Sequence, residues 1–313
     1  PWRSIDVAEH SAGLKMGSRL SASEATAHAI PRNHVVPRRY PGRVIAVIVI
    51  LILALQAGKA VATNPNFHWE VYAEYIFSPT VLRGVGWTLL LTVVAMGIAI
   101  PLALTLVVMR ESINPILRGA AWCWVWFFRG TPVYTQLAFW GLFAVLFPSI
   151  SVSIPFGPEL VSIESRWIVT PAVAAIIGLS FNESAYLTEI FRAGFRAIDP
   201  GQIEAAQAIG MSRPKIWTRI LIPQAMRIII PPTGNETIGM LKMTSLVLAV
   251  PFTLDLTFAT NAIANRTYLP VPLLLVAATW YLVITSALMV GQYYLERYYG
   301  RGQGPVLGKG GQH

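Results

Sequence analysis

The stretch QIEAAQAIGMSRPKIWTRILIP, Gln202 to Pro223, decides the fold because it is polar and basic while long apolar runs flank it on both sides. Such a segment is an aqueous excursion between two membrane spans. Its basic residues, Arg213, Lys215 and Arg219, place the excursion on the cytoplasmic side under the positive-inside rule. The rest of the chain is therefore organised as membrane spans around a cytoplasmic loop.

The local pattern of this loop predicts two short helices joined by a sharp bend. Residues 202–209 have small and apolar side chains on one helical face. Gly210 then supplies a helix stop with access to a left-handed conformation. Ser212 followed by Pro214 is typical of an N-cap and the first turn of a second helix.

The composition indicates an integral membrane protein. Of 313 residues, 54% are hydrophobic and only 12% are charged, too few to cover a chain of this length with a water-compatible surface. The net charge of +9 comes from Lys and Arg at the ends of apolar runs, so nucleic-acid binding is not expected. The single Cys123 permits no intrachain disulfide and is expected to be buried, and no metal-ligand cluster is visible.

The apolar runs predict an all-α protein with about six membrane spans. The third is expected to be broken, with 122–128 as an interfacial helix that feeds a tilted span. Because most Lys and Arg lie in the intervening inner segments, both termini are predicted to be cytoplasmic. The expected spans are residues 44–63, 85–108, 122–147, 168–191, 226–254 and 273–294.

The tails and the first span are predicted to be separate from the core. Residues 1–43 are polar and basic and are expected to be a disordered cytoplasmic tail, and residues 300–313 are expected to be a flexible one. Residues 44–63 are interpreted as an extra, uncleaved N-terminal span, because the polar leader is too long for a signal peptide.

The loop resembles the EAA loop of the integral-membrane subunits of ATP-binding cassette importers. The shared pattern is Glu-Ala-Ala, three residues, Gly, nine residues and Ile-x-Leu-Pro, with Ile222 here in place of the usual Leu. The resemblance implies the type I importer permease fold over residues 81–299, with the loop at 202–223, in a bacterial inner membrane. The coupling residues that it implies are Glu204, Ala205, Ala206, Gly210, Ile220 and Pro223.

By the same resemblance, the loop would dock in a cleft of a separate ATPase subunit. Glu204 would contact that subunit, and the small residues would allow close approach. ATP and Mg²⁺ would be bound by the ATPase and no cofactor by this chain, which has no P-loop or nucleophile elbow and is not expected to be an enzyme. A second permease subunit, identical or different, and a periplasmic substrate-binding protein would complete the importer.

Three further stretches resemble the polar amino-acid subfamily of these importers. They are FFRGTPVYTQL at 127–137, YLTEIFRAGFRAIDPGQ at 186–202 and GNETIGMLKMTSL at 234–246. Met243 departs from the subfamily, in which many members have an acidic residue there. The resemblance implies import of polar amino acids, with opines or related amine osmolytes as alternative cargo.

Ionisable and polar groups inside spans are costly and indicate function or helix pairing. The candidate pathway residues are Arg129, Thr131, Asn182, Glu183, Asn235, Glu236, Lys242 and Ser245. Thr131 and the proline after it would open a helix whose free N–H groups could face a carboxylate, whereas Arg129 could also simply extend to the lipid headgroups.

Lys242 leaves two interpretations open. Its ammonium either pairs with a carboxylate, Glu183 or Glu236, or faces a water-filled path with an anionic ligand. In a rival class of protein, a self-contained secondary transporter or channel, the same three residues would couple an ion. Glu189 and Arg192, spaced i,i+3, are expected to form a salt bridge at the helix end.

Overall fold

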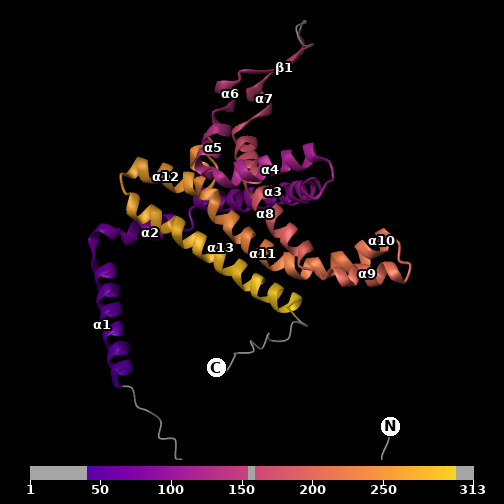
Figure 1. The fold of residues 1–313 in the computed structure, drawn as a ribbon. Helices are drawn as coiled ribbons and strands as arrows, with labels where there is room; N and C mark the ends of the chain where they lie inside the picture. Colours follow the sequence, from indigo (N-terminus) through magenta and orange to yellow (C-terminus); the bar gives the residue numbers. More distant parts are fainter. Residues whose placement is uncertain (1–40, 154–158, 301–313) are drawn as a thin grey trace, which may run out of the picture. The chain divides into compact units, whose positions relative to one another are not determined.

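The computed structural model describes residues 41–153 and 159–300, so the predictions for tail residues 1–40 and 301–313 lie outside the described part. The chain divides into two units, Pro1–Val61 and Ala62–His313. The elements are shown in Figure 1. Their bounds are α1 Pro41–Thr63, η1 Pro65–Phe67, α2 Trp69–Tyr75, α3 Pro79–Arg110, α4 Pro115–Gly130, α5 Val133–Gly141, α6 Phe143–Leu146, β1 Ser149–Ser153, β2 Glu159–Glu164, α7 Ser165–Ile168, α8 Pro171–Arg196, α9 Pro200–Ala208, α10 Arg213–Ile216, the π-helical turn η2 Trp217–Leu221, α11 Ile222–Met243, η3 Thr244–Ala249, α12 Leu256–Thr267 and α13 Pro270–Tyr299.

Three helices among the described residues are long and apolar enough to cross a membrane. They are Gly42–Thr63, Pro79–Arg110 and Pro270–Tyr299. The expected fourth and fifth spans correspond to the long helices α8 and α11, which carry charged residues. The protein is therefore helical and membrane-embedded, and the number of six spans stays a prediction.

The first unit presents one apolar helix. All side chains of residues 42–63 in α1 are exposed, and most of them are aliphatic. A helix of 23 residues is long enough to cross a hydrocarbon core of about 30 Å. An exposed aliphatic surface of this kind is suited to contact with lipid acyl chains.

The main core of the second unit forms where α3, α8 and α11 pack together. Ala95, Ala99 and Ala103 recur every four residues along α3 and are fully buried. Small side chains at this spacing let helix backbones approach closely, which is how membrane helices associate without a strong hydrophobic driving force. Leu179 of α8 and Met240 of α11 belong to the same cluster and are also fully buried.

A second cluster joins the start of α3 to α12 and α13. Val81, Leu256 and Val276, one from each helix, are fully buried in it. The Trp280 side chain of α13 donates its Nε1–H to the Ile76 carbonyl at 2.8 Å, which ties α13 to the end of α2. The start of α3 is therefore enclosed by helices that follow much later in the chain.

Helix α11 continues through Pro231 and Pro232, although two successive prolines usually interrupt or kink a helix. Proline has no N–H, so Pro231 and Pro232 leave the carbonyls of residues 227 and 228, four positions earlier, without their usual helical donors. Other side chains contact the backbone around the two prolines: the Gln292 Nε2 amide donates to the Pro231 carbonyl at 2.7 Å, and the Thr233 hydroxyl donates to the Ile229 carbonyl at 2.8 Å. The Gln292 contact holds α11 against α13 at this point of the helix.

Two segments that lie between the expected spans have regular structure. Residues 149–164 include an antiparallel hairpin in which β1 pairs with β2, from Ser149 opposite Glu164 to Ser153 opposite Glu159. Residues 255–270 contain the helix α12, whose first N–H groups are capped by the Asp255 carboxylate at 2.9 and 3.2 Å. The wholly helical fold class stands with this small hairpin added.

We predict that Gly84→Ala destabilises the permease while Gly86→Ala does not. A Cβ at Gly84 would lie 2.9 Å from the Leu256 Cα, and the Leu256 N–H is fixed by a 3.1 Å bond to the Thr88 hydroxyl. Overpacking of this kind costs about 1 to 3 kcal/mol. Gly86 has no atom within 4 Å of its Cβ position, so alanine there should be neutral or slightly stabilising.

The measurement is the melting temperature of the two purified variants in the same detergent. Equal melting temperatures would contradict the close packing of α3 on α12.

Candidate functional site

The polar loop forms a tight bend after α9. The Gly210 φ angle is +77°, a left-handed conformation that strains residues with a Cβ. The Met211 N–H donates to the Ala206 carbonyl at 3.0 Å, and the Gly210 N–H donates to the Gln207 carbonyl at 2.9 Å. These two bonds form a Schellman motif, so the predicted helix stop is present and its cause is backbone geometry.

The second half of the loop differs from the prediction of a second short helix. Ser212 occupies the N-cap position of α10, but its side chain makes no capping hydrogen bond. From Arg213 the helical backbone continues through the π-helical turn Trp217–Leu221 directly into α11. The bend at Gly210 is therefore followed by one continuous helical segment. Single π-helical turns within α-helices are often found at functional sites.

Specific contacts connect the loop to the helices beside it. The Gln224 amide of α11 donates to the Gln202 side-chain oxygen of α9 at 2.6 Å. The rings of Phe195 in α8 and Trp217 in the π turn lie 5.7 Å apart. In Figure 1, α9 and α10 lie at the ends of α8 and α11, where both helices leave the core.

The predicted coupling residues have different surroundings. Glu204, Ala205, Gly210 and Pro223 are exposed, and Ile220 is half-buried. Ala206 is buried within the chain itself, so its small side chain serves the packing of the loop.

Ion pairs join the end of α8 to the end of α3 next to the loop. Glu189 and Arg192 pair at 2.8 Å, as their spacing predicts, and Arg110 approaches the same carboxylate at 3.5 Å. Arg196 pairs with Glu111 at 2.9 Å.

A pocket of about 410 Å³ lies where α4, α5, α8 and α11 meet. It contains four of the predicted pathway residues, Arg129, Thr131, Asn182 and Glu236. The remaining lining residues are Gly130, Pro132, Val133, Tyr186 and Met243. The predicted break in the third span, at Thr131 and Pro132, thus forms one wall of this pocket.

A buried hydrogen-bond network fixes that break. The Asn182 amide donates to the Phe128 carbonyl at 2.9 Å and to the Gln136 side-chain oxygen at 3.1 Å. Gln136 in turn donates to the Phe128 and Thr131 carbonyls at 3.0 and 3.1 Å, and to the Thr131 hydroxyl at 2.7 Å. The carbonyls exposed by the break are therefore satisfied by side chains.

Sequence reasoning missed Gln136, the centre of this network. The candidate residues included two neutral amides, Asn182 and Asn235, but not Gln136. A usable signal was present, because Gln136 is a hydrogen-bonding side chain in an apolar run only five residues after Thr131.

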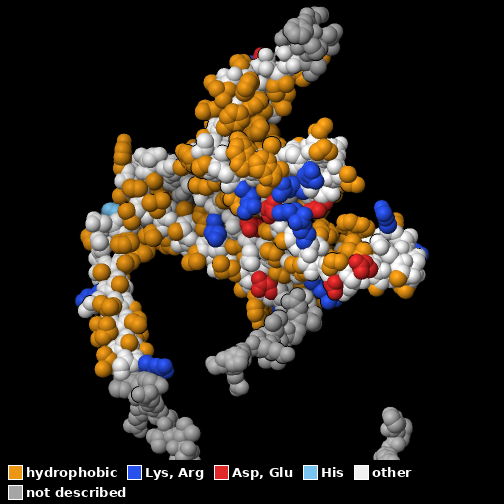
Figure 2. Space-filling model, in the orientation of Figure 1, with side chains coloured by type: hydrophobic (Ala, Val, Ile, Leu, Met, Phe, Trp, Pro, Cys, Tyr) orange, Lys and Arg blue, Asp and Glu red, His pale blue; other side chains and the backbone are white. Residues whose placement is uncertain are grey.

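The pocket presents charges of both signs. The Arg129 guanidinium lies over the Tyr186 ring at 5.2 Å, a cation–π contact, and interacts electrostatically with Glu236. In Figure 2 acidic and basic side chains gather near the middle of the face drawn, with hydrophobic side chains around them.

Glu183 follows the pocket residue Asn182 in α8, is not part of the pocket lining and interacts electrostatically with Glu236. It is 0% exposed, and neither of its carboxylate oxygens has a hydrogen-bond partner. A buried carboxylate without a donor is costly unless a cation approaches or a proton neutralises it. Arg129, Glu236 and Glu183 thus give the site one basic and one acidic side.

The other predicted residues of α11 do not line the pocket. Lys242 and Asn235 are exposed, and Lys242 forms no ion pair with a described carboxylate, so the pairing with Glu183 or Glu236 is not present. Ser245 lies in the 3₁₀ helix η3 that follows α11, and its hydroxyl donates to the Lys242 carbonyl at 2.7 Å. The pocket face of α11 is marked instead by Glu236 and Met243, seven residues apart.

Two smaller expectations concern Cys123 and metals. Cys123 is exposed on α4, not buried, because α4 turns that side away from the core. Over residues 41–153 and 159–300, no group of three or more His, Cys, Asp or Glu side chains is placed to hold a metal ion.

Comparison with known proteins gives consistent results. Residues 97–300 match the family described as the inner membrane component of binding-protein-dependent transport systems. The chain is 46% identical over 271 residues to the arginine transport system permease protein ArgU of Corynebacterium glutamicum. The matched region covers 87% of this chain and 84% of ArgU. It is 35% identical over 207 residues to the histidine/lysine/arginine/ornithine transport system permease protein HisM of Escherichia coli strain K12, covering 65% and 80% of the two chains.

Among solved structures, the chain resembles an amino acid ABC transporter crystallised with histidines. The TM-score is 0.58 with 32% sequence identity, and the match covers 71% of this chain and 95% of the other. A component of a binding-protein-dependent system does not work as a self-contained secondary transporter or channel. The chain belongs to the family of inner membrane components of binding-protein-dependent transport systems.

Proposed function

We propose that the protein is the permease subunit of an ATP-driven importer for polar amino acids, and that its cargo carries a cationic side chain. The observation that supports this most is the pocket at the broken helix, where Arg129 and Glu236 present opposite charges. The names of the relatives, an arginine permease and a histidine/lysine/arginine/ornithine permease, agree with this cargo.

The carboxylate of the cargo would bind on the basic side. Arg129 offers a guanidinium suited to a bidentate carboxylate contact. Beside it, Pro132 occupies the N-cap position of α5 and no side chain caps this helix, so the first N–H groups of α5 are free to bind an anion.

The cationic side chain would bind on the acidic side, at Glu236, which interacts electrostatically with Glu183. An opine adds a second carboxylate, which would meet these two acidic groups, so we favour a basic amino acid over an opine.

The partners follow from the proposed importer class. The loop at 202–223 would dock on a separate ATPase, which holds ATP and Mg²⁺. A periplasmic binding protein would deliver the cargo, and a second permease subunit would flank the pathway. Closure of the ATPase would move α9 and the continuous helical segment after it as one rigid unit. This movement would open the transport pathway alternately to the two faces of a bacterial inner membrane. In this arrangement both termini lie in the cytoplasm.

We expect Glu236→Gln and Arg129→Gln to change transport in different ways. Loss of the Glu236 charge should reduce uptake of arginine and lysine about tenfold or more, while glutamine uptake is less affected, because only cationic cargo loses a charged hydrogen bond. Loss of the Arg129 guanidinium should reduce uptake of all three, because each has an α-carboxylate.

The measurement is ATP-dependent uptake into proteoliposomes with the ATPase and a binding protein. Glu74→Gln, which neutralises an exposed carboxylate on α2, serves as the control and should transport normally. Equal losses for arginine and glutamine in Glu236→Gln would contradict the acidic subsite.

We expect Glu204→Lys to leave membrane insertion intact while transport is abolished. Glu204 is exposed on α9 in a loop that is otherwise basic. Reversal of a carboxylate that is buried against a partner costs about 2 to 5 kcal/mol. The measurement is copurification of the ATPase with the tagged permease, together with uptake.

Gln207→Lys is the matched control, because it adds a positive charge to an exposed position of the same helix and keeps Glu204. Normal uptake by Glu204→Lys at normal expression would refute the coupling role.

A further inference from the structure

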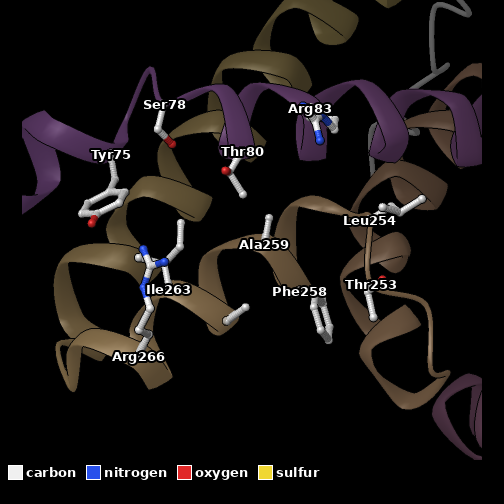
Figure 3. Close-up of a pocket in the computed structure, with 11 residues that line it drawn as sticks. Tyr75, Ser78, Thr80, Arg83, Thr253, Leu254, Phe258, Ala259, Ile263 and Arg266 are labelled. Carbon is white, nitrogen blue, oxygen red and sulfur yellow. The ribbon is translucent and has the colours of Figure 1, made fainter.

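A second pocket, of about 460 Å³, lies between the start of α3 and helix α12. Figure 3 shows Arg83 of α3 and Arg266 of α12 on different walls, with Thr80 and Ala259 between them in this view. None of its lining residues is shared with the pocket at the broken helix. The two pockets are therefore separate sites.

The charge of this second pocket is uncompensated. Arg83 and Arg266 both line it, and no acidic residue does. Neither guanidinium forms an ion pair with a carboxylate in the described part of the chain. Tyr75, Ser78 and Thr80 add hydroxyl groups to the same lining. The polar part of the pocket is suited to an anion that accepts several hydrogen bonds, as a phosphate group does.

The position of Arg83 indicates the depth of this pocket in the membrane. Arg83 is the fifth residue of α3, a helix apolar enough to span a bilayer, so it lies about 6 Å from the helix start. Phe77 and Tyr268, which flank the pocket in sequence, are 70% and 87% exposed. Exposed aromatic residues at the end of a span are typical of the headgroup region.

Apart from Thr253, the rest of the lining is apolar. Leu254, Phe258, Ala262 and Ile263 contribute to it. A free anion gains nothing from such a surface, whereas an amphiphile with a phosphate group and acyl chains gains from both parts. We propose that this pocket binds the headgroup of an anionic phospholipid, with the phosphate held between Arg83 and Arg266 and the upper acyl chain against the apolar residues.

The test compares the native permease complex with a variant that carries both Arg83→Gln and Arg266→Gln. Delipidated complex is titrated with phosphatidylglycerol, phosphatidylcholine or inorganic phosphate, and binding is followed by native mass spectrometry and melting temperature. Phosphatidylglycerol should bind the native complex and raise its melting temperature, and its affinity for the variant should be about tenfold or more weaker, because two charged hydrogen-bond donors are lost. Phosphatidylcholine should bind both proteins weakly.

Arg118→Gln is the matched control, because Arg118 is an exposed guanidinium on α4 that lies outside the pocket. It should bind phosphatidylglycerol as the native complex does. If the double variant does not insert, the two single variants are compared in the same way, and each should weaken binding.

Three results would overturn the proposal. Unchanged phosphatidylglycerol binding in the variants would show that the pocket holds no headgroup. Equal stabilisation by inorganic phosphate would identify a site for a free anion. Unchanged lipid binding with loss of ATP hydrolysis stimulated by the binding protein would assign the two arginines to a protein contact.

Discussion

The Asn182 amide of α8 donates a hydrogen bond to the Phe128 carbonyl at the end of α4, and the pocket depends on this contact. Inside a membrane, a backbone can leave the helical conformation only where other groups satisfy the carbonyls it exposes. Asn182 and Gln136 together satisfy Phe128 and Thr131. The break between α4 and α5 is thus stable, and it brings Arg129 and the uncapped start of α5 to the same pocket wall.

The two helices opposite this break connect the pocket to the loop at residues 202–223. Helix α8 runs from Asn182 and Tyr186 to Arg196, whose ion pair with Glu111 fixes it to α3. Ten residues separate Tyr186 from Arg196, a length of about 15 Å of helix. On the other side, α11 continues without a break from Glu236 back to the π turn and α10. A displacement of the loop would therefore reach two walls of the pocket through rigid helices.

Local chemistry in the sequence predicted much of this arrangement, and tertiary contacts decided the rest. The glycine bend and the Glu189–Arg192 pair depend on neighbouring residues, and the break at Thr131 is marked by the proline that follows it, so these three features could be predicted from local patterns. Where α11 passes through Pro231, it is held to α13 by Gln292, 61 residues later, and no local pattern contains that contact. For the same reason the sequence grouped Lys242 with the pathway, whereas the packing of α11 turns Glu236 and Met243 to the pocket.

Both carboxyl oxygens of Glu183 are buried without a hydrogen-bond partner, and Glu183 interacts electrostatically with Glu236. A proton neutralises a carboxyl group in such surroundings unless a cation approaches it. In the proposed function, a cationic side chain bound at Glu236 would favour the ionised form of Glu183, whereas neutral cargo would not and a second carboxylate would oppose it. Discrimination would then come from the protonation of Glu183 as well as from the contact that the cargo makes at Glu236. Glu183 would favour cationic cargo without touching it.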